Sequence, residues 1–165
     1  MPIVDALLPE YDHEMATTRK VLERVPDDKF AWKPHDKSMS MQGLATHVAT
    51  LTSWGKATIE HPTFDLAVPH TPPQVNSRAD LLRVFDETSA ATRASLVGRS
   101  DAELLEPWSL KHGEQTILTM PKVGVLRSFV LNHLIHHRGQ LSVYLRLQDV
   151  PVPSIYGPSA DEGGM

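Results

Sequence analysis

Histidines gather in one short segment of this sequence. Three of the nine histidines fall within five residues, at positions 133, 136 and 137. On a helix, His133 and His137 lie on one face, ~40° apart around the axis. Two imidazoles at this spacing can reach one metal ion at the ~2.0–2.1 Å that zinc prefers. Because the same spacing also arises by chance, a metal site needs a further ligand from elsewhere in the chain.

His47 is the best candidate for that third ligand. It lies in an apolar stripe between Leu44 and Leu51 of another predicted helix. A single inward histidine is more often a hydrogen-bonded core residue than a ligand. Three inward imidazoles, however, cost several kcal/mol to bury unless each finds a partner, and one cation would satisfy all three lone pairs. We therefore predict that His47, His133 and His137 bind one divalent metal ion.

The other histidines are weaker candidates. His136 lies ~60° from His133 on the opposite flank, so the geometry also allows His133 and His136 to be the pair that binds the metal. We expect His136 to support the ligands or to lie at an interface. The remaining histidines fall on an outer helical face or in predicted loops, where solvated side chains are the default: His13, His35, His61, His70 and His112.

Two acidic residues and several missing motifs limit the chemistry. Asp12 and Glu14 border the inner stripe of the first predicted helix and could approach the metal, although solvated charges are favoured. Leu134 follows His133, so the glutamate of a metalloprotease helix is missing and peptidase activity is unsupported. The chain has no cysteine, which excludes thiolate ligands, thiol nucleophiles and disulfides.

Proline-free windows define the elements that would position these residues. Apolar residues spaced by three and four predict a helix in each window. The predicted helices run from upstream of Pro9 to Val25, from Ser38 or Ser40 to about Glu60, from Ser77 with an apolar stripe that reaches Leu96, and from about Lys122 to about Gln148. Residues 100–107 allow a further short helical turn. We predict an all-α fold, a four-helix bundle forming a single domain over residues 1–165, with a possible small hairpin within residues 108–120.

Composition excludes several classes of partner. Sixteen basic against twenty acidic side chains give a net charge of −4, which argues against binding to nucleic acid. No stretch approaches the ~18 consecutive apolar residues of a membrane span. Four acidic residues precede the first basic residue, Arg19, so a signal peptide is not expected and we predict a cytoplasmic protein.

The tail from Val150 to Glu162 is expected to pack on the helices through Ile155 and Tyr156.

Several segments together suggest a known family. They are the Tyr11-Asp12 helix, the connector from Phe30 to Pro34, the helix from Ser40 to Val48, the run from Asn132 to Arg146, and the tail from Val150 to Glu162. With these segments the chain resembles the DinB superfamily, which includes the YfiT-like metal-dependent hydrolases. The likeness covers about residues 5–162, and the His-His-Arg-Gly-Gln run and the tail are its most specific parts.

The resemblance implies a four-helix bundle, usually a homodimer, that holds one divalent metal ion, often nickel or zinc. It implies ligands from one histidine of the second helix and two of the last, which correspond here to His47, His133 and His137. Characterised members of the superfamily include thiol-dependent transferases and a thiol-dependent isomerase. The hydrolase name is therefore an expectation about class only.

Four functions remain open at this point. Three neutral histidines leave a divalent ion with a net charge of about +2 and open positions, which is typical of catalytic sites. Such a site could hydrolyse a small-molecule substrate, or transfer a low-molecular-weight thiol to an electrophile. Gln140 and Tyr144 share the histidine face and could hydrogen-bond a bound water or substrate. The alternatives are a non-catalytic, stress-related metal-binding protein and a purely structural bundle. No catalytic residue beyond the metal ligands is identified.

Overall fold

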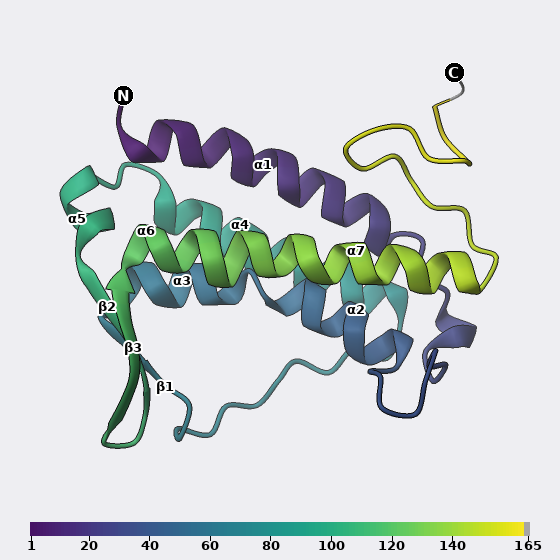
Figure 1. Cartoon of the computed structure of the whole chain (residues 1–165), viewed down its shortest axis with the longest axis horizontal. Helices are drawn as coiled ribbons and strands as arrows, with labels where there is room; N and C mark the ends of the chain where they lie inside the picture. The colour runs from purple at the N-terminus through teal and green to yellow at the C-terminus, as the bar shows by residue number, and fades with distance from the viewer. Residues whose placement is uncertain (164–165) are drawn as a thin grey trace.

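Helices make up most of the chain, and the longest of them run side by side (Figure 1). The computed structural model describes residues 1–163. Its helices are α1 (Ile3–Leu22), η1 (Asp27–Lys29), α2 (Met41–Thr50), α3 (Ser53–Glu60), α4 (Arg78–Leu96), α5 (Asp101–Leu105), and α6 (Lys122–Val125), which continues through the π-helical η2 (Leu126–Leu131) into α7 (Asn132–Leu147). None of the helices within residues 1–163 is long and apolar enough to cross a membrane.

Serine caps begin three of these helices. The Ser40 hydroxyl accepts from the backbone N–H of Gly43 at the start of α2, and Ser77 accepts from Asp80 at the start of α4. Ser100 forms a capping box with Glu103 at α5. Each cap satisfies a backbone N–H group that has no partner within the first turn of its helix. The predicted starts at Ser40 and Ser77 are therefore confirmed.

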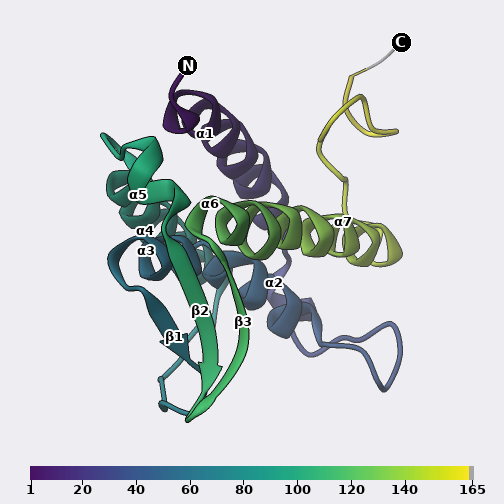
Figure 2. The same cartoon turned by 60° about the vertical axis from the view of Figure 1, so that its left-hand side comes forward.

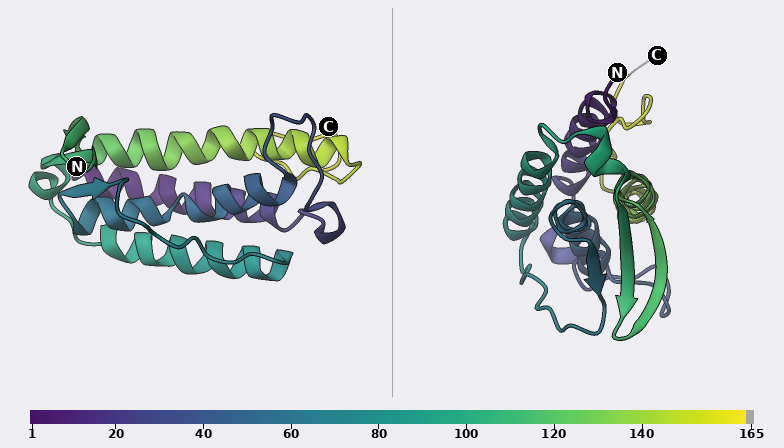
Figure 3. Two further views of the ribbon diagram at one scale, coloured as in Figure 1. Left: turned by 90° about the horizontal axis from the view of Figure 1, so that it is seen from below. Right: turned by 90° about the vertical axis from the view of Figure 1, so that its left-hand side faces the viewer.

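The second predicted helix is divided into α2 and α3. The hydroxyl of Thr50 donates back to the carbonyls of Thr46 and His47, at 2.9 and 3.2 Å. Bonds of this kind compete with the helical ladder and bend helices. α4 packs against α1 on one side and against α2 and α3 on the other (Figure 3). α7 packs against α1 and α2, while η2 and α6, which precede it, pack against α3. Residues from α2 and α7 can therefore face each other.

The expectation of an all-α fold is wrong, because a small sheet lies beside the helices (Figure 2). Within residues 1–163 it has three strands: β1 (Thr63–Asp65), β2 (Pro107–His112) and β3 (Gln115–Pro121). β2 and β3 form the predicted antiparallel hairpin. β1 pairs with β2 in parallel, and a strand of three residues is too short to show a period of two in the sequence. The fold is mostly helical with a small sheet.

A buried ion pair joins α7 to α1. Arg138 is 1% exposed, and its Nη1 lies 2.7 Å from Oε2 of Glu14, which is 5% exposed. The Tyr156 hydroxyl accepts from Arg138 at 2.8 Å and donates to Glu14 at 2.9 Å. The sequence-based expectation that Glu14 is solvated is therefore wrong, and Arg138, which a simple helical count turns away from the face of His133 and His137, lies in the core.

The tail packs on the helices, as predicted from the sequence. Beyond the hydroxyl contacts of Tyr156, Asp161 pairs with Arg146 of α7. Glu162 lies 2.5 Å from Arg24, which follows α1. The tail turns back from the end of α7 toward the end of α1 (Figure 1). It thus connects the ends of two helices that lie far apart in the sequence.

Gly55 allows α3 and α4 to approach closely. The Thr92 hydroxyl donates to the Thr52 carbonyl at 2.6 Å and accepts from the Lys56 N–H at 3.1 Å. A Cβ atom on Gly55 would lie 2.4 Å from the Thr92 methyl group. That distance is far inside van der Waals contact, so only glycine fits here without a shift of one helix.

We expect Gly55→Ala to lower the free energy of unfolding by about 1–3 kcal/mol, because the added methyl overpacks the α3–α4 contact. Gly139→Ala is the matched control, since a Cβ there meets nothing within 4 Å. The control should be neutral or should stabilise by up to about 1 kcal/mol through helix propensity. Urea denaturation followed by circular dichroism measures both changes. Equal effects of the two substitutions would contradict the close approach.

Candidate metal centre

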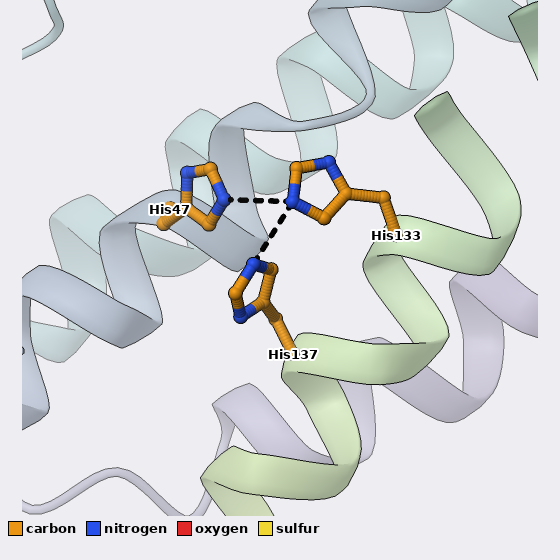
Figure 4. A group of neighbouring side chains, drawn as sticks. All are labelled: His47, His133 and His137. Atoms are coloured by element: carbon orange, nitrogen blue, oxygen red, sulfur yellow. Dashed lines mark hydrogen bonds between the residues drawn. The ribbon is translucent and has the colours of Figure 1, made fainter. Parts of the chain in front are cut away.

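Three histidines converge between α2 and α7 (Figure 4). His47 comes from α2, and His133 and His137 come from successive turns of α7. The Nε2 atom of His133 lies 3.4 Å from Nε2 of His47 and 2.9 Å from Nε2 of His137. One nitrogen from each ring lies within 4.8 Å of the other two. The structure thus brings together the three residues that the sequence singled out.

Hydrogen bonds alone do not satisfy these three nitrogens. A neutral imidazole nitrogen carries either one proton or one lone pair. If Nε2 of His133 carries the proton, it can donate to only one neighbour, and if it carries the lone pair, two donors must share it. A metal bound at about 2.0–2.1 Å with ligand angles of about 90–110° would place its nitrogens about 2.9–3.4 Å apart. The two spacings from Nε2 of His133, 3.4 and 2.9 Å, fit a shared cation.

Gln140 sets the tautomer of His137. Its amide oxygen lies 2.7 Å from Nδ1 of His137. Because the amide oxygen accepts, Nδ1 donates, and Nε2 keeps its lone pair for a metal. Support of this kind is usual behind histidine ligands. Gln140 therefore lies behind the ligand, and its amide oxygen is directed at His137.

Tyr144 packs as a structural residue. Its hydroxyl donates to the carbonyl of Met39 at 3.2 Å, and its ring meets Trp32 edge to face with centroids 5.5 Å apart. These contacts tie α7 to the segment before α2. They favour the packing role over hydrogen bonding to a bound water.

Burial keeps the histidines in the form that binds metal. Burial, together with the neighbouring His137 and His133, lowers the pKa of His47 to about 4. Burial and His137 also lower the pKa of His133, while a hydrogen bond with the backbone of Phe129 opposes that change. Metals bind neutral imidazole, so a lowered pKa favours metal binding at neutral pH.

A π-helical segment precedes the two histidines of α7. η2 ends at Leu131, directly before α7 begins. Such segments shift the phase of a helix and occur often at functional sites. Beyond it, Leu134, Leu141 and Leu145 face the core, fully buried. His133 and His137 therefore lie at the edge of this stripe, half-buried and turned toward α2.

The other sequence candidates do not join the group. His136 is exposed, and its ring lies edge to face with that of His137, with centroids 4.8 Å apart. Asp12 forms an ion pair with Arg93 of α4 at 2.7 Å. Glu14 is paired with Arg138 in the core. Both carboxylates thus have partners away from the three histidines.

Several cavities flank the histidines, and two of them lie beside His137 and His47. One of ≈ 440 Å³ is lined by His137, Gln140 and Tyr144. The other, of ≈ 390 Å³, is lined by His47 together with Trp54, Phe64, His70 and several smaller side chains. Both volumes fall in the range of small-molecule pockets, about 300–1,000 Å³. Sequence reasoning treated His70 as a solvated loop residue, and no periodic pattern connects it to His47.

Comparison with known proteins gives consistent results. A family model described as the DinB family matches residues 4–163. The chain is similar to the protein YrdA of Bacillus subtilis, with 26% identity over 163 residues, 96% of this chain and 91% of YrdA.

Two solved structures of DinB-like proteins share the fold. YjoA of Bacillus subtilis aligns with a TM-score of 0.67 and 18% identity, over 96% of this chain and 99% of YjoA. A protein from Bacillus cereus ATCC 10987 aligns with a TM-score of 0.71 and 20% identity, over 92% and 97%. At these identities the likeness establishes the fold alone.

The lowered pKa of His47 predicts that the metal-free protein loses stability as the pH falls from about 6.5 to about 4. Over this range the unfolded chain protonates its histidine at the ordinary value of ~6.5, while the folded chain resists protonation, so protons favour unfolding. In the presence of a chelator, the melting temperature of His47→Gln should fall less than that of the parent as the pH is lowered from about 7.5 to about 4.5. His61→Gln, an exposed histidine outside the site, should match the parent. Equal losses for parent and His47→Gln would contradict the shift.

Proposed function

The chain belongs to the DinB family, and we propose that it is a metal-dependent enzyme that holds one divalent ion, nickel or zinc, on His47, His133 and His137. The convergence of three Nε2 atoms, which hydrogen bonds among themselves cannot all satisfy, supports this proposal. We further propose that the helices act as a four-helix bundle in which α2 and α3 together count as one helix. In this arrangement two helices that pack on each other supply all three ligands.

The ligand set suits a catalytic metal. Structural zinc sites normally have four protein ligands, whereas catalytic sites keep a position open. Among residues 1–163, the group that could hold a metal contains three histidines and no carboxylate. When bound, a divalent ion at this site would activate a water molecule or hold a thiol as thiolate. The chain would supply the orientation, with Gln140 fixing the ring of His137.

The two cavities favour transfer of a low-molecular-weight thiol over hydrolysis. A transfer reaction must hold two molecules at the metal together, whereas hydrolysis needs room for one molecule and water. His137 lines one cavity and His47 lines the other, so each has direct access to the ligand group. Since the chain has no cysteine, the thiol must come from a small molecule. We therefore propose thiol transfer to a small electrophilic substrate, with hydrolysis as the alternative within the same site.

The protein's assembly and location are proposed from its sequence. We propose a homodimer, in line with the resemblance to the superfamily. Val143 and Leu147 are apolar residues on the outer side of α7, 57% and 55% exposed, and are available to such an interface. A cytoplasmic location stays a prediction of the sequence.

We expect about one divalent ion per chain in protein purified without a histidine tag. His47→Ala, His133→Ala and His137→Ala should each lose most of that metal, because two remaining ligands bind too weakly to survive purification. His136→Ala is the matched control, since it is a neighbouring histidine outside the group, and it should keep the metal. Elemental analysis measures the content. An empty site in His136→Ala alone would show that the ligand assignment is wrong.

The cobalt-substituted protein should change its visible spectrum when azide or a small thiol is added at millimolar concentration. Three histidine ligands leave a position that an anion can take, and the visible bands of Co²⁺ respond to the coordination number. Titration followed by absorbance measures the change. If neither ligand moves the spectrum, the metal is sealed, and a non-catalytic, stress-related metal-binding protein becomes the better account.

A further inference from the structure

We propose that the cavity beside His47 binds the aromatic ring of an anionic small-molecule substrate whose charged group lies at the metal. This inference names the substrate class and rests on the proposed function. It depends on the chemistry of the cavity wall and on its position next to one metal ligand.

Aromatic rings form one side of this cavity. Trp54 and Phe64 lie with ring centroids 4.8 Å apart and planes inclined by 30°. The ring of His70 meets the edge of Phe64 at 6.0 Å. At this distance the two rings pack against each other, and a further ring placed against the aromatic faces and edges that line the cavity gains both apolar burial and aromatic contact. A flat ring therefore suits this wall better than a thick aliphatic group of equal size.

The cavity lacks charge apart from its metal end. Its other lining residues are small hydroxyl, aliphatic and proline side chains, with no Asp, Glu, Lys or Arg among those described: Thr50, Leu51, Ser53, Ala57, Thr71, Pro72 and Pro73. A charged group buried against such a wall would lose hydration without gaining a partner. The net charge of about +2 on a metal held by three neutral histidines would attract an anion instead. The ligand is therefore expected to have an anionic end and an uncharged body.

Three separate elements hold the aromatic wall in place. Trp54 lies seven residues after His47 on the α2–α3 segment, so it lies on the same side, about two turns along. β1 carries Phe64 and is fixed by its parallel pairing with β2, in which Phe64 is opposite Leu110. Asp65 accepts from the backbone N–H of Gly113 at 2.9 Å, which ties β1 to the hairpin turn. The wall is thus preformed by the fold.

Three small carboxylate ligands, used as probes, separate the contributions of the charge, the apolar body and the aromatic ring to binding. Acetate tests the anionic end alone, cyclohexylacetate adds an aliphatic body, and phenylacetate adds an aromatic ring of similar size. Titration calorimetry on the zinc-loaded protein should give a dissociation constant for phenylacetate at least fivefold lower than for cyclohexylacetate. Acetate should bind more weakly than both. Equal affinity for phenylacetate and cyclohexylacetate would overturn the aromatic assignment.

A cavity-filling variant locates the ring. Ala57→Leu adds volume inside the cavity on a half-buried helical position. It should weaken phenylacetate binding at least tenfold and leave acetate binding and zinc content unchanged. Val143→Leu is the matched control because it adds volume in the cavity beside His137, and it should leave phenylacetate binding unchanged. If Val143→Leu weakens phenylacetate and Ala57→Leu does not, the ring lies in the other cavity and the proposal is wrong.

Phe64→Leu tests the wall itself. It should reduce the preference for phenylacetate over cyclohexylacetate to less than twofold, while the zinc content stays at about one per chain. Should this variant fold poorly, His70→Ala replaces an exposed loop residue at the edge of the same wall and should lower the preference by a smaller factor. An unchanged preference in a folded variant of either kind would overturn the proposal.

Metal removal separates this inference from the proposed function. In chelator-treated protein, the preference for phenylacetate over cyclohexylacetate should persist, since the wall consists of protein. If the protein holds no metal but keeps this preference, the metal-dependent function fails and the aromatic cavity stands. If zinc-loaded protein binds acetate but gains nothing from the phenyl ring, the metal site stands and the aromatic cavity is wrong.

Discussion

The ion pair of Arg138 and Glu14 fixes the rotation of α7, and the histidine site depends on that rotation. Both side chains are almost fully buried, and the Tyr156 hydroxyl bonds to each of them. Leaving one buried charge without its partner costs about 3–5 kcal/mol, so α7 cannot turn freely about its axis. His137 is the preceding residue, about 100° around the helix. With Arg138 held toward α1, His137 turns toward α2, where His47 lies.

The three histidines could be found from the sequence because each depends on local periodicity. A spacing of four places His133 and His137 on one face whatever the rest of the chain does. His47 stood out because its neighbours at three and four residues are apolar. The Ser40 and Ser77 caps are local in the same sense, since each serine bonds to a residue three positions later. These signals need no knowledge of which helices touch.

Features that join distant segments could not be found in this way. Arg138 and Glu14 are 124 residues apart, and each alone reads as a surface charge on its helix. β1 has three residues and owes its existence to pairing with β2, more than forty positions later. The π-helical turns of η2 also change the phase on which a simple helical count relies, so a face counted across η2 does not identify Arg138 as buried. The correction from an all-α fold follows from the same limit.

The small sheet has a clear relation to the histidines. β2 and β3 bury Trp108 and Leu110 against Val125, which anchors the hairpin at the start of the last helix. β1 adds to this hairpin and brings Phe64 against Trp54, at the wall of the cavity that His47 lines. The helices alone would hold three imidazoles at an open surface. The sheet adds an apolar wall beside His47, and in small-molecule sites apolar walls of this kind enclose the ligand while a few polar groups orient it.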